Sequence, residues 1–289
     1  MIRIIKKISL LVCLISILSQ AQIYKDKDVE ICKSKFEMAI SKNLAFEPIG
    51  NVITAVGKSF LGTVYIAHTL EVGDTEQLVI NLTGLDCTTF LENSLVFSRL
   101  IKEGKTTFKD YENELKKIRY RDSKLDQYPS RLHYFSDWIY NNTHKGIVKD
   151  VTKEIGGEPI KFDVGFMSEN PKYYVQLKDN PEFIPIIKKQ EEAINKREYY
   201  YIPKEKVAAI ESKIHNGDLI AITTNLKGLD IGHVGIAIKM DDGRIHFLHA
   251  PIVGSKVQIT DEPLPDYLAR VKKHTGIIVL RAIDPSALK

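Results

Sequence analysis

Hydrophobic residues recur at helical spacing in two long stretches of the first half of the chain. The first stretch predicts an amphipathic helix over residues 27–43. Its expected buried face carries, at intervals of three and four, Val29, Cys32, Phe36 and Ile40. The second stretch begins near Asp86, and its expected buried face comprises Phe90, Leu91, Leu95, Phe97, Leu100 and Ile101. Gly104 follows this stretch at the position where a helix C-cap is expected.

After Pro203 the pattern changes to short runs rich in β-branched residues, which predict strands. These runs cover residues 218–224, 233–238, 244–249 and 276–280. Between the second and third runs, Asp241-Asp242-Gly243 predicts a hairpin turn. A helical region followed by an antiparallel sheet is typical of an α+β fold, which is the class we expect.

The stretch between these regions, about residues 105–205, is irregular, charged and rich in tyrosine. Shorter helices are predicted within it at 108–116, 131–140 and 182–197. The sequence contains no internal repeat and no linker rich in Pro, Gly or Ser. We therefore expect residues 22–289 to form a single domain, with the irregular stretch as an insertion.

Residues 1–21 have the parts of a secretory signal peptide. A basic segment with Arg3, Lys6 and Lys7 precedes a short apolar run, and the small residue Ala21 lies before an expected cleavage site at Gln22. The apolar run is short for a membrane span, although an uncleaved anchor stays open as the alternative. We expect cleavage near Ala21, export to the periplasm, and no membrane span afterwards.

Amino-acid composition and net charge exclude few classes of function. The chain of 289 residues is 44% hydrophobic and 27% charged, which is typical of a globular protein. The formal net charge is +4, but without the basic signal segment 38 basic residues face 37 acidic ones. A nucleic-acid partner is therefore not expected, because such binding normally needs a basic face.

Cleavage of the signal would leave Cys32 and Cys87, which could form one disulfide in an oxidising compartment. Cys32 lies on the buried face of its predicted helix and resembles a core residue. Cys87 instead falls in the first turn of the second helix. Free N–H groups and the helix dipole can stabilise a thiolate there, and the same N–H groups can hold an oxyanion.

A cysteine nucleophile also needs a base, commonly a histidine that a third group orients. His233 begins one predicted strand and His249 ends the next, so the hairpin would bring both to the same end of the sheet. The alternatives are a core cysteine with two structural histidines, or a zinc site that also uses His246. His246 and His249 are an odd number of residues apart on one strand, which points them to opposite faces and disfavours zinc.

These residues lie in segments that resemble a known family. Residues 81–92, which contain Asp86-Cys87, resemble the nucleophile helix of the NlpC-type papain-like cell-wall cysteine hydrolases. Residues 217–220, 233–236 and 248–250 resemble the sheet strands that carry the two histidines. The N-acetylmuramoyl-L-alanine amidase-like branch is the closer match, through residues 60–65, 128–138, 201–203 and 228–233. Val64 and Pro251 depart from that branch, which usually has Pro and Ser there.

The resemblance implies a papain-like fold in which a nucleophile helix packs on an antiparallel sheet. It implies a catalytic triad of Cys87, His233 and His249 that hydrolyses the amide between N-acetylmuramic acid and L-alanine in muropeptides. The expected substrates are peptidoglycan fragments from cell-wall turnover in a bacterium, and no metal or organic cofactor is expected. The alternatives are an endopeptidase that cuts between D-Glu and the diamino acid, an acyltransferase, and an inactive cell-wall binding module.

The resemblance also suggests residues that contact the substrate. These candidates are Tyr65, Asp86, Ser130, Arg131 and Trp138. Arg131 could bind a carboxylate or the lactyl group, and Trp138 could stack on a sugar. The alternatives are structural: an N-cap for Asp86 and Ser130, and packing for Tyr65 and Trp138. Asp218 and Asp230 are expected to fix turns. The oligomeric state is not predicted.

Overall fold

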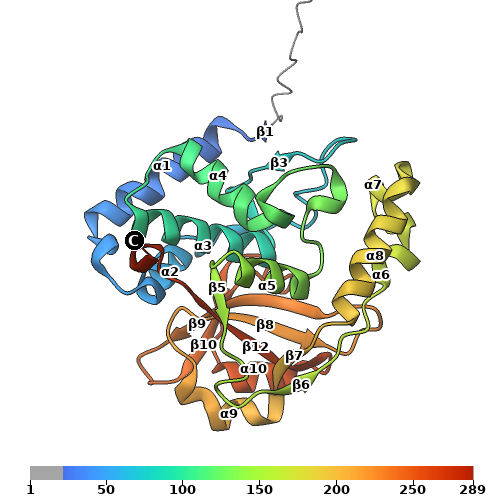
Figure 1. The fold of residues 1–289 in the computed structure, drawn as a ribbon. Coiled ribbons are helices and arrows are strands. Elements are labelled where there is room, and N and C mark those ends of the chain that lie inside the picture. The colour runs from blue at the N-terminus through green and yellow to red at the C-terminus, as the bar shows by residue number, and fades with distance from the viewer. Residues whose placement is uncertain (1–21, 289) are drawn as a thin grey trace, which may run out of the picture.

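The computed structural model describes residues 22–288, so the predicted signal peptide lies outside the described residues. Helices gather on one side of a large sheet, and two further short helices cover its other side (Figure 1). The helices are α1 Asp26–Ser41, α2 Ile49–Lys58, α3 Cys87–Glu103, α4 Phe108–Arg119, α5 Phe135–His144, α6 Phe166–Glu169, α7 Val175–Asp179, α8 Ile184–Asn195, α9 Val207–Ile210 and α10 Leu264–Arg270.

The main sheet has the strand order β11-β10-β9-β8-β12-β7-β6, and β5 also pairs with β12. Its neighbouring strands are antiparallel throughout. These strands are β5 Val148–Asp150, β6 Glu158–Ile160, β7 Tyr199–Pro203, β8 Leu219–Thr224, β9 Ile231–Lys239, β10 Ile245–His249, β11 Gln258–Ile259 and β12 His274–Ala282. Two short parallel pairs complete the fold, made by β1 Gln22–Ile23 with β3 Leu78–Val79, and by β2 Val64–Tyr65 with β4 Gly84–Leu85.

Strand β8 explains why the C-terminal runs are almost continuously hydrophobic. Leu219 and Ala221 belong to the larger core cluster, which contains the buried face of α3. Ile220 and Ile222 belong to the second cluster, which contains Leu268 of α10. Successive strand residues point to opposite faces, so a strand covered on both faces has few polar positions.

The four predicted strand runs correspond to β8, β9, β10 and β12, and β9 and β10 form the predicted hairpin with Gly243 at positive φ in the turn. Helices α4, α5 and α8 occupy the three regions predicted within the insertion. The pattern did not reveal that the insertion also supplies β5, β6 and β7 to the sheet. These are short strands at or near the sheet edge, and residues 199–201 within β7 are all tyrosine.

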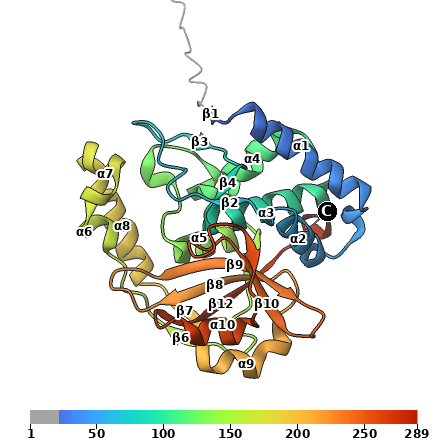
Figure 2. The same ribbon diagram turned by 180° about the vertical axis from the view of Figure 1, so that it is seen from behind.

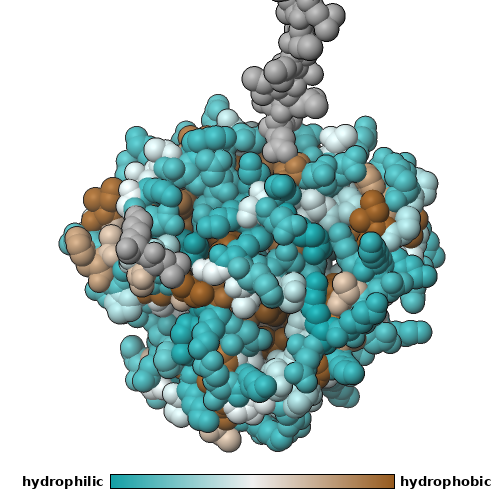
Figure 3. Space-filling view, viewed as in Figure 1, coloured by the Kyte–Doolittle hydropathy of each residue, from teal (hydrophilic) through white to brown (hydrophobic). Residues whose placement is uncertain are grey.

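One predicted core position is wrong. Ile40 is 66% exposed, whereas Cys32, Phe36 and Ala39 of α1 are buried. The contact face therefore ends one residue earlier than the apolar pattern suggests. Figure 3 shows a hydrophobic patch on the surface where α1 ends, in the region where Ile40 and Phe46 are exposed. Within residues 22–288, no helix combines the length and apolar composition that crossing a bilayer requires.

Candidate active site

Helix α3 begins at Cys87, close to the predicted start, and Asp86 is its N-cap. The Thr89 N–H donates to Asp86 Oδ1 at 2.7 Å, and the Asp86 N–H donates to the Thr89 hydroxyl at 2.9 Å. This reciprocal capping fixes the first turn. The thiol of Cys87 therefore lies among the unpaired N–H groups of a long, buried helix. Figure 2 shows the β2–β4 pair beside this end of α3.

The hairpin brings the two predicted histidines together. His249 pairs with Gly235 across the β9–β10 ladder, and His233 lies two residues before Gly235. The Nε2 atom of His233 lies 2.8 Å from Nδ1 of His249, within hydrogen-bond distance. This hydrogen bond uses Nε2 of His233 and leaves Nδ1 for another partner. His249 is buried and therefore suited to hold the His233 ring in one orientation.

Cys87 and His233 line the same cavity, which has a volume of about 210 Å³. The backbone of Val234, the residue after His233, hydrogen bonds to Cys87. The start of β9 and the first turn of α3 are thus in direct contact. Nucleophile and base candidates that are distant in sequence lie together at one wall of this cavity, which we call the Cys87 pocket.

The protonation states of Cys87 and His233 differ from the sequence-based expectation that the helix N-terminus stabilises a Cys87 thiolate. Burial and the Asp86 carboxylate raise the pKa of Cys87 to about 11, although hydrogen bonds from Val234 and Thr88 act in the opposite direction. Burial, with a smaller effect of His274, lowers the pKa of His233 to about 3. Near neutral pH the resting pair is therefore a thiol and a neutral imidazole, because desolvation outweighs the helix N-terminus.

Of the candidate substrate contacts, Tyr65 lies nearest to this chemistry. It belongs to β2, which pairs with β4 immediately before Asp86 and Cys87. Burial, followed by the charges of Cys87 and Asp86, raises the pKa of Tyr65 to about 12. Tyr65 is thus a protonated phenol beside the nucleophile. Asp86 itself is engaged as a helix cap, which is the structural alternative for that residue.

Three other candidates lie elsewhere, and here the structure corrects the sequence interpretation. Trp138 is a core residue, only 1% exposed, stacked on Phe135 with its indole N–H donating to Glu92 at 3.2 Å. It has no surface with which to stack on a sugar. Ser130 bonds to the backbone of Gln127 and does not cap α5, which begins five residues later. It lines a different surface depression.

Arg131 is also not free for a substrate carboxylate. It is 6% exposed and forms ion pairs with Glu71 at 2.5 Å and Glu76 at 3.3 Å. Burial opposes the charge of Arg131, but these two carboxylates raise its pKa overall. Its guanidinium is therefore bound within the protein, and the partner that faces the Cys87 pocket is Glu71.

Three further histidines, His246, His133 and His274, differ in where they lie relative to the Cys87 pocket. His246 bonds to the Thr260 carbonyl at 2.8 Å and to Asp242 at 2.9 Å, away from His233, as its odd spacing predicted. His133, which was not among the predicted site residues, lines the Cys87 pocket. The only sequence signal for His133 was its place inside the family-like segment 128–138. His274 is buried, with its ring centroid 5.7 Å from that of Tyr267.

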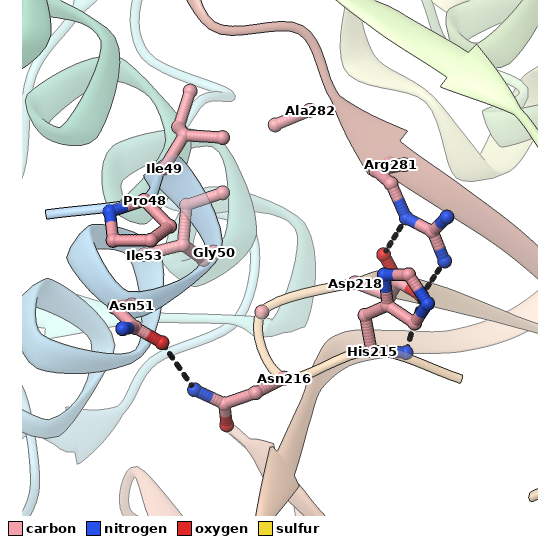
Figure 4. A pocket seen from close by; sticks show the side chains of 11 residues that line it. Pro48, Ile49, Gly50, Asn51, Ile53, His215, Asn216, Asp218, Arg281 and Ala282 are labelled. Atoms are coloured by element: carbon pink, nitrogen blue, oxygen red, sulfur yellow. Dashed lines mark hydrogen bonds and ion pairs between the residues drawn. The ribbon is translucent and has the colours of Figure 1, made fainter. Parts of the chain in front are cut away.

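Asp218 and Asp230 both have structural roles, although only Asp218 bonds within its own turn as expected. Asp230 accepts from the backbone N–H of Ser136 at 2.7 Å, which anchors the start of α5 beside the Cys87 pocket. Asp218 accepts two hydrogen bonds from Arg281 and one from the His215 backbone. Figure 4 shows the latter group at a separate cavity of about 240 Å³ between α2 and β12, which contains no cysteine.

The other chemical alternatives were a disulfide and a zinc site. Both cysteines among the described residues are free thiols, so Cys32 and Cys87 are not joined. Within residues 22–288, no three His, Cys, Asp or Glu side chains are grouped as a metal site would require.

A family model described as AmiA-like, N-acetylmuramoyl-L-alanine amidase-like, matches residues 55–277. The chain belongs to this amidase-like family. The matched range contains Cys87, His233 and His249 together with the walls of the Cys87 pocket. None of the curated proteins matches the chain.

Solved structures agree with this family. A crystal structure of an N-acetylmuramoyl-L-alanine amidase from Bacteroides uniformis is 39% identical, with a TM-score of 0.78, and the match covers 81% of this chain and 99% of that one. A Bacteroides fragilis protein described as a xylanase is 42% identical, with a TM-score of 0.74 over 78% of this chain and 98% of that one. A Legionella pneumophila protein shares the fold at 21% identity, with a TM-score of 0.70 over 89% of this chain and 95% of that one.

Proposed function

We propose that this protein hydrolyses the amide between the lactyl group of N-acetylmuramic acid and L-alanine, with Cys87, His233 and His249 as its catalytic triad. The observation that carries the proposal is the hydrogen bond between His233 and the buried His249, together with the pocket that His233 shares with Cys87 at a helix N-terminus. Membership of the amidase-like family supports the choice of bond. We further propose that the arrangement of α3 on the sheet is the papain-like fold of the NlpC-type hydrolases.

The proposed reaction begins from neutral groups. As the sulfur of Cys87 attacks the lactyl carbonyl carbon, its proton moves to His233, which acts as a general base. The Cys87 N–H helps to hold the oxyanion of the tetrahedral intermediate. His233 then gives the proton to the alanine nitrogen as the C–N bond breaks, which leaves a muramoyl thioester. Water, deprotonated by His233, hydrolyses the thioester and restores the thiol.

The neutral resting pair gives His249 a definite role in this scheme. His233 carries a positive charge only while it holds the transferred proton. The ring of His249 keeps His233 oriented throughout through the 2.8 Å hydrogen bond. When His233 is protonated, Nδ1 of His249 can accept from it and stabilise that charge. Tyr65, beside Cys87, is placed to contact the reacting part of the substrate.

We propose that the substrates are muropeptides released during cell-wall turnover, and that the protein meets them in the periplasm after cleavage near Ala21. The proposal about export rests on residues 1–21 alone. The mass of the protein recovered from the periplasm of an expressing bacterium tests it. A mature chain that starts at Gln22 is expected, whereas retention of residues 1–21 in the membrane fraction would contradict it.

Product analysis separates the proposed reaction from its alternatives. The purified protein is incubated with a defined muramoyl tripeptide, and the products are measured by mass spectrometry. Free muramic acid derivative and whole tripeptide are expected, whereas a muramoyl-L-Ala-D-Glu product would indicate the endopeptidase. Added amine that appears as a muramoyl amide would indicate acyl transfer. Xylan is a useful further substrate because one structural neighbour is described as a xylanase, and no cleavage of it is expected.

Cys87→Ala should abolish hydrolysis without loss of the fold, because the side chain is small and its removal leaves little empty space. Circular dichroism and thermal unfolding check the fold, and product mass spectrometry checks the activity. Cys32→Ala is the matched control, since Cys32 is buried in the core and should affect stability alone. EDTA should leave activity unchanged. Turnover by Cys87→Ala would contradict the assignment of Cys87 as the nucleophile. So would a loss of activity in EDTA that added zinc restores.

The three histidines of the hairpin should differ in their effects on turnover. His233→Ala should reduce kcat by about 10³-fold or more, because it removes the base. His249→Asn or His249→Gln should keep measurable activity through a neutral hydrogen bond, and His249→Ala should lose more. His246→Gln should be close to neutral. An inactive His246→Gln together with an active His249→Ala would assign the third triad position to His246 instead.

A further inference from the structure

The Cys87 pocket is also lined by polar side chains that can accept hydrogen bonds. Glu71 lines the pocket, with Oε1 bound to Arg131 at 2.5 Å. Within residues 22–288, its other oxygen, Oε2, is buried and has no hydrogen-bond partner. An unsatisfied buried carboxylate oxygen is costly in the free protein, which suggests that a ligand satisfies it.

The neighbouring Tyr128 provides a second, independent observation. The residue is fully buried and lines the same pocket, yet among the described residues its hydroxyl has no hydrogen-bond partner. Its ring packs near the Arg131 guanidinium, whose carbon lies 5.1 Å from the ring centroid. The side chain is thus fixed by packing while its polar end is left unsatisfied. Tyr120 makes the contrast clear, since its hydroxyl bonds to Glu76 at 2.8 Å and to the Gln77 carbonyl at 3.0 Å.

His133 adds a third polar group of defined character. Its Nε2 atom lies 2.9 Å from the carbonyl oxygen of Tyr128, which can only accept, so Nε2 carries the proton. Burial, followed by the charge of Arg131, lowers the pKa of His133 well below its ordinary value. The ring is therefore neutral, and its Nδ1 atom is an acceptor.

The charges of this cluster also decide which ligands it disfavours. One guanidinium, Arg131, is shared by the two carboxylates Glu71 and Glu76. Because Arg131 is already engaged by these two acidic side chains, it is not free to attract a substrate carboxylate, and Glu71 presents a hydrogen-bond acceptor to the pocket. From the sequence, Arg131 was a candidate to bind a carboxylate or the lactyl group, whereas its charge is used within the protein by Glu71 and Glu76.

We propose that Glu71 and Tyr128 form a subsite that binds the hydroxyl or acetamido N–H donors of the muramoyl sugar and thereby sets the preference for the sugar side of the amide. The inference rests on the proposed function. The sugar half of that substrate is uncharged once its lactyl carboxyl is in the amide, and it is rich in donors. The peptide half carries carboxylates. Tyr134 and Tyr174 also line the pocket, and aromatic rings suit the apolar face of a sugar.

Two substrates with the same scissile amide test this subsite. One is N-acetylmuramoyl-L-Ala-D-Glu, and the other is D-lactoyl-L-Ala-D-Glu, which lacks the sugar. Tyr128→Phe should raise KM for the muramoyl substrate by about 3- to 10-fold, and Glu71→Ala by about 10- to 100-fold, with smaller changes in kcat. Glu71→Gln should lie between, since its amide oxygen still accepts. None of these three variants should change KM for the lactoyl peptide.

Stability measurements separate binding from folding. Tyr128→Phe removes a hydroxyl without a partner, so its Tm should not fall below that of the wild type. Tyr120→Phe is the matched control, because it loses two hydrogen bonds and should lower Tm while leaving KM unchanged. Glu192→Gln, an exposed change on α8, controls for loss of a negative charge.

The outcomes are distinct. Equal KM changes on both substrates, or no change on either, would overturn the sugar subsite while leaving the proposed amidase function standing. If the wild type cleaves no muramoyl amide but cleaves peptides with a free N-terminal L-alanine, the proposed function fails. In that case complete loss of peptide cleavage in Glu71→Gln would show that the carboxylate binds an ammonium group, and the sugar subsite would fail with it.

Discussion

Asp86 and Cys87 are adjacent at the start of α3. The negative charge of Asp86 stabilises the helix but disfavours a second negative charge on the Cys87 thiol. The carboxylate of Asp86 caps the helix through the Thr89 N–H, which stabilises the element that carries the nucleophile. The same charge disfavours a thiolate at Cys87 and contributes to its raised pKa. At this site the helix cap lowers the acidity of the thiol, so in the proposed reaction the thiol proton would pass to His233 during the attack.

This balance predicts the pH dependence of thiol alkylation. The rate of Cys87 modification by iodoacetamide should rise about tenfold per pH unit from pH 6 towards 10, because the thiolate is the reacting form. A carboxylate raises the pKa of a neighbouring thiol, so Asp86→Asn should lower it and speed alkylation at pH 8 by about 3- to 10-fold. Asn remains a good N-cap, so the helix is preserved.

Mass spectrometry of the alkylated protein measures this rate, with Cys32 as an internal control. Cys32 is buried, and burial raises its pKa to about 12, so it should stay unmodified in the native protein. The Cys87→Ala variant gives the background. A rate that already reaches a plateau below pH 7 would show a preformed thiolate–imidazolium pair, and would contradict the neutral resting state.

At this scale the sequence predicted that Cys87, His233 and His249 would lie close together, but it did not predict the partners of the other polar residues. Cys87, His233 and His249 stand at ends of elements whose pattern is strong, so their proximity follows from the topology. Arg131 and Trp138 could not be assigned in this way. Their partners, Glu71 and Glu92, lie tens of residues away, and residue type alone does not tell a buried ion pair from a substrate contact.

Within the β9–β10 hairpin, Gly235 links the sequence motif to the geometry of the two histidines. A Cβ atom at this position would lie 2.7 Å from the Leu248 carbonyl oxygen and 2.7 Å from the ring of Phe247. That ring packs against both His233 and His249, with centroid distances of 5.7 and 4.8 Å. Glycine therefore leaves room for the Phe247 ring, which packs against both histidines.

Gly235→Ala should consequently impair both folding and catalysis. The added methyl group would displace buried atoms, which typically costs about 1–3 kcal/mol in stability, and it would shift the ring on which the histidines rest. Thermal unfolding and kcat are the measurements. Ile238→Ala, on the same strand, is the control, because Ile238 belongs to the larger core cluster on the opposite face of the sheet from Phe247. If both variants lose kcat equally, general loosening of the sheet, and not support by Phe247, would explain the result.

Element prediction succeeded where the hydrophobic period was long and failed at the sheet edges. Most residues of strands β8, β9, β10 and β12 are buried, so their hydrophobic runs could be recognised in the sequence. Helix α3 is also buried on nearly all sides. The short strands β5, β6 and β11 span only two or three residues each, too few to establish a period of two. Their strand conformation is set by the pairing partner and not by local sequence.

The molecule as a whole has a core that crosses the boundaries of the predicted insertion. Tyr111, Trp138 and Ile187 come from the insertion, yet they belong to the same core cluster as Cys32 and Ile278. Buried ion pairs reinforce this continuity, as Arg119 of α4 bonds to Glu92 of α3 at 2.8 Å. An autonomous insertion would need a core of its own, and the second cluster lies instead beneath the sheet, around α10.

This arrangement predicts that the whole chain unfolds as one unit. Trp138 is the single tryptophan of the protein and lies buried inside the insertion, so its fluorescence reports that region. Far-UV circular dichroism reports all helices and strands. In urea, the red shift of Trp138 emission and the loss of circular dichroism should share one midpoint. An earlier fluorescence transition, with catalysis surviving it, would show that the insertion folds separately. Addition of the muramoyl substrate to Cys87→Ala should leave the emission maximum unchanged, because Trp138 packs against Phe135 and Glu92 and does not line the Cys87 pocket.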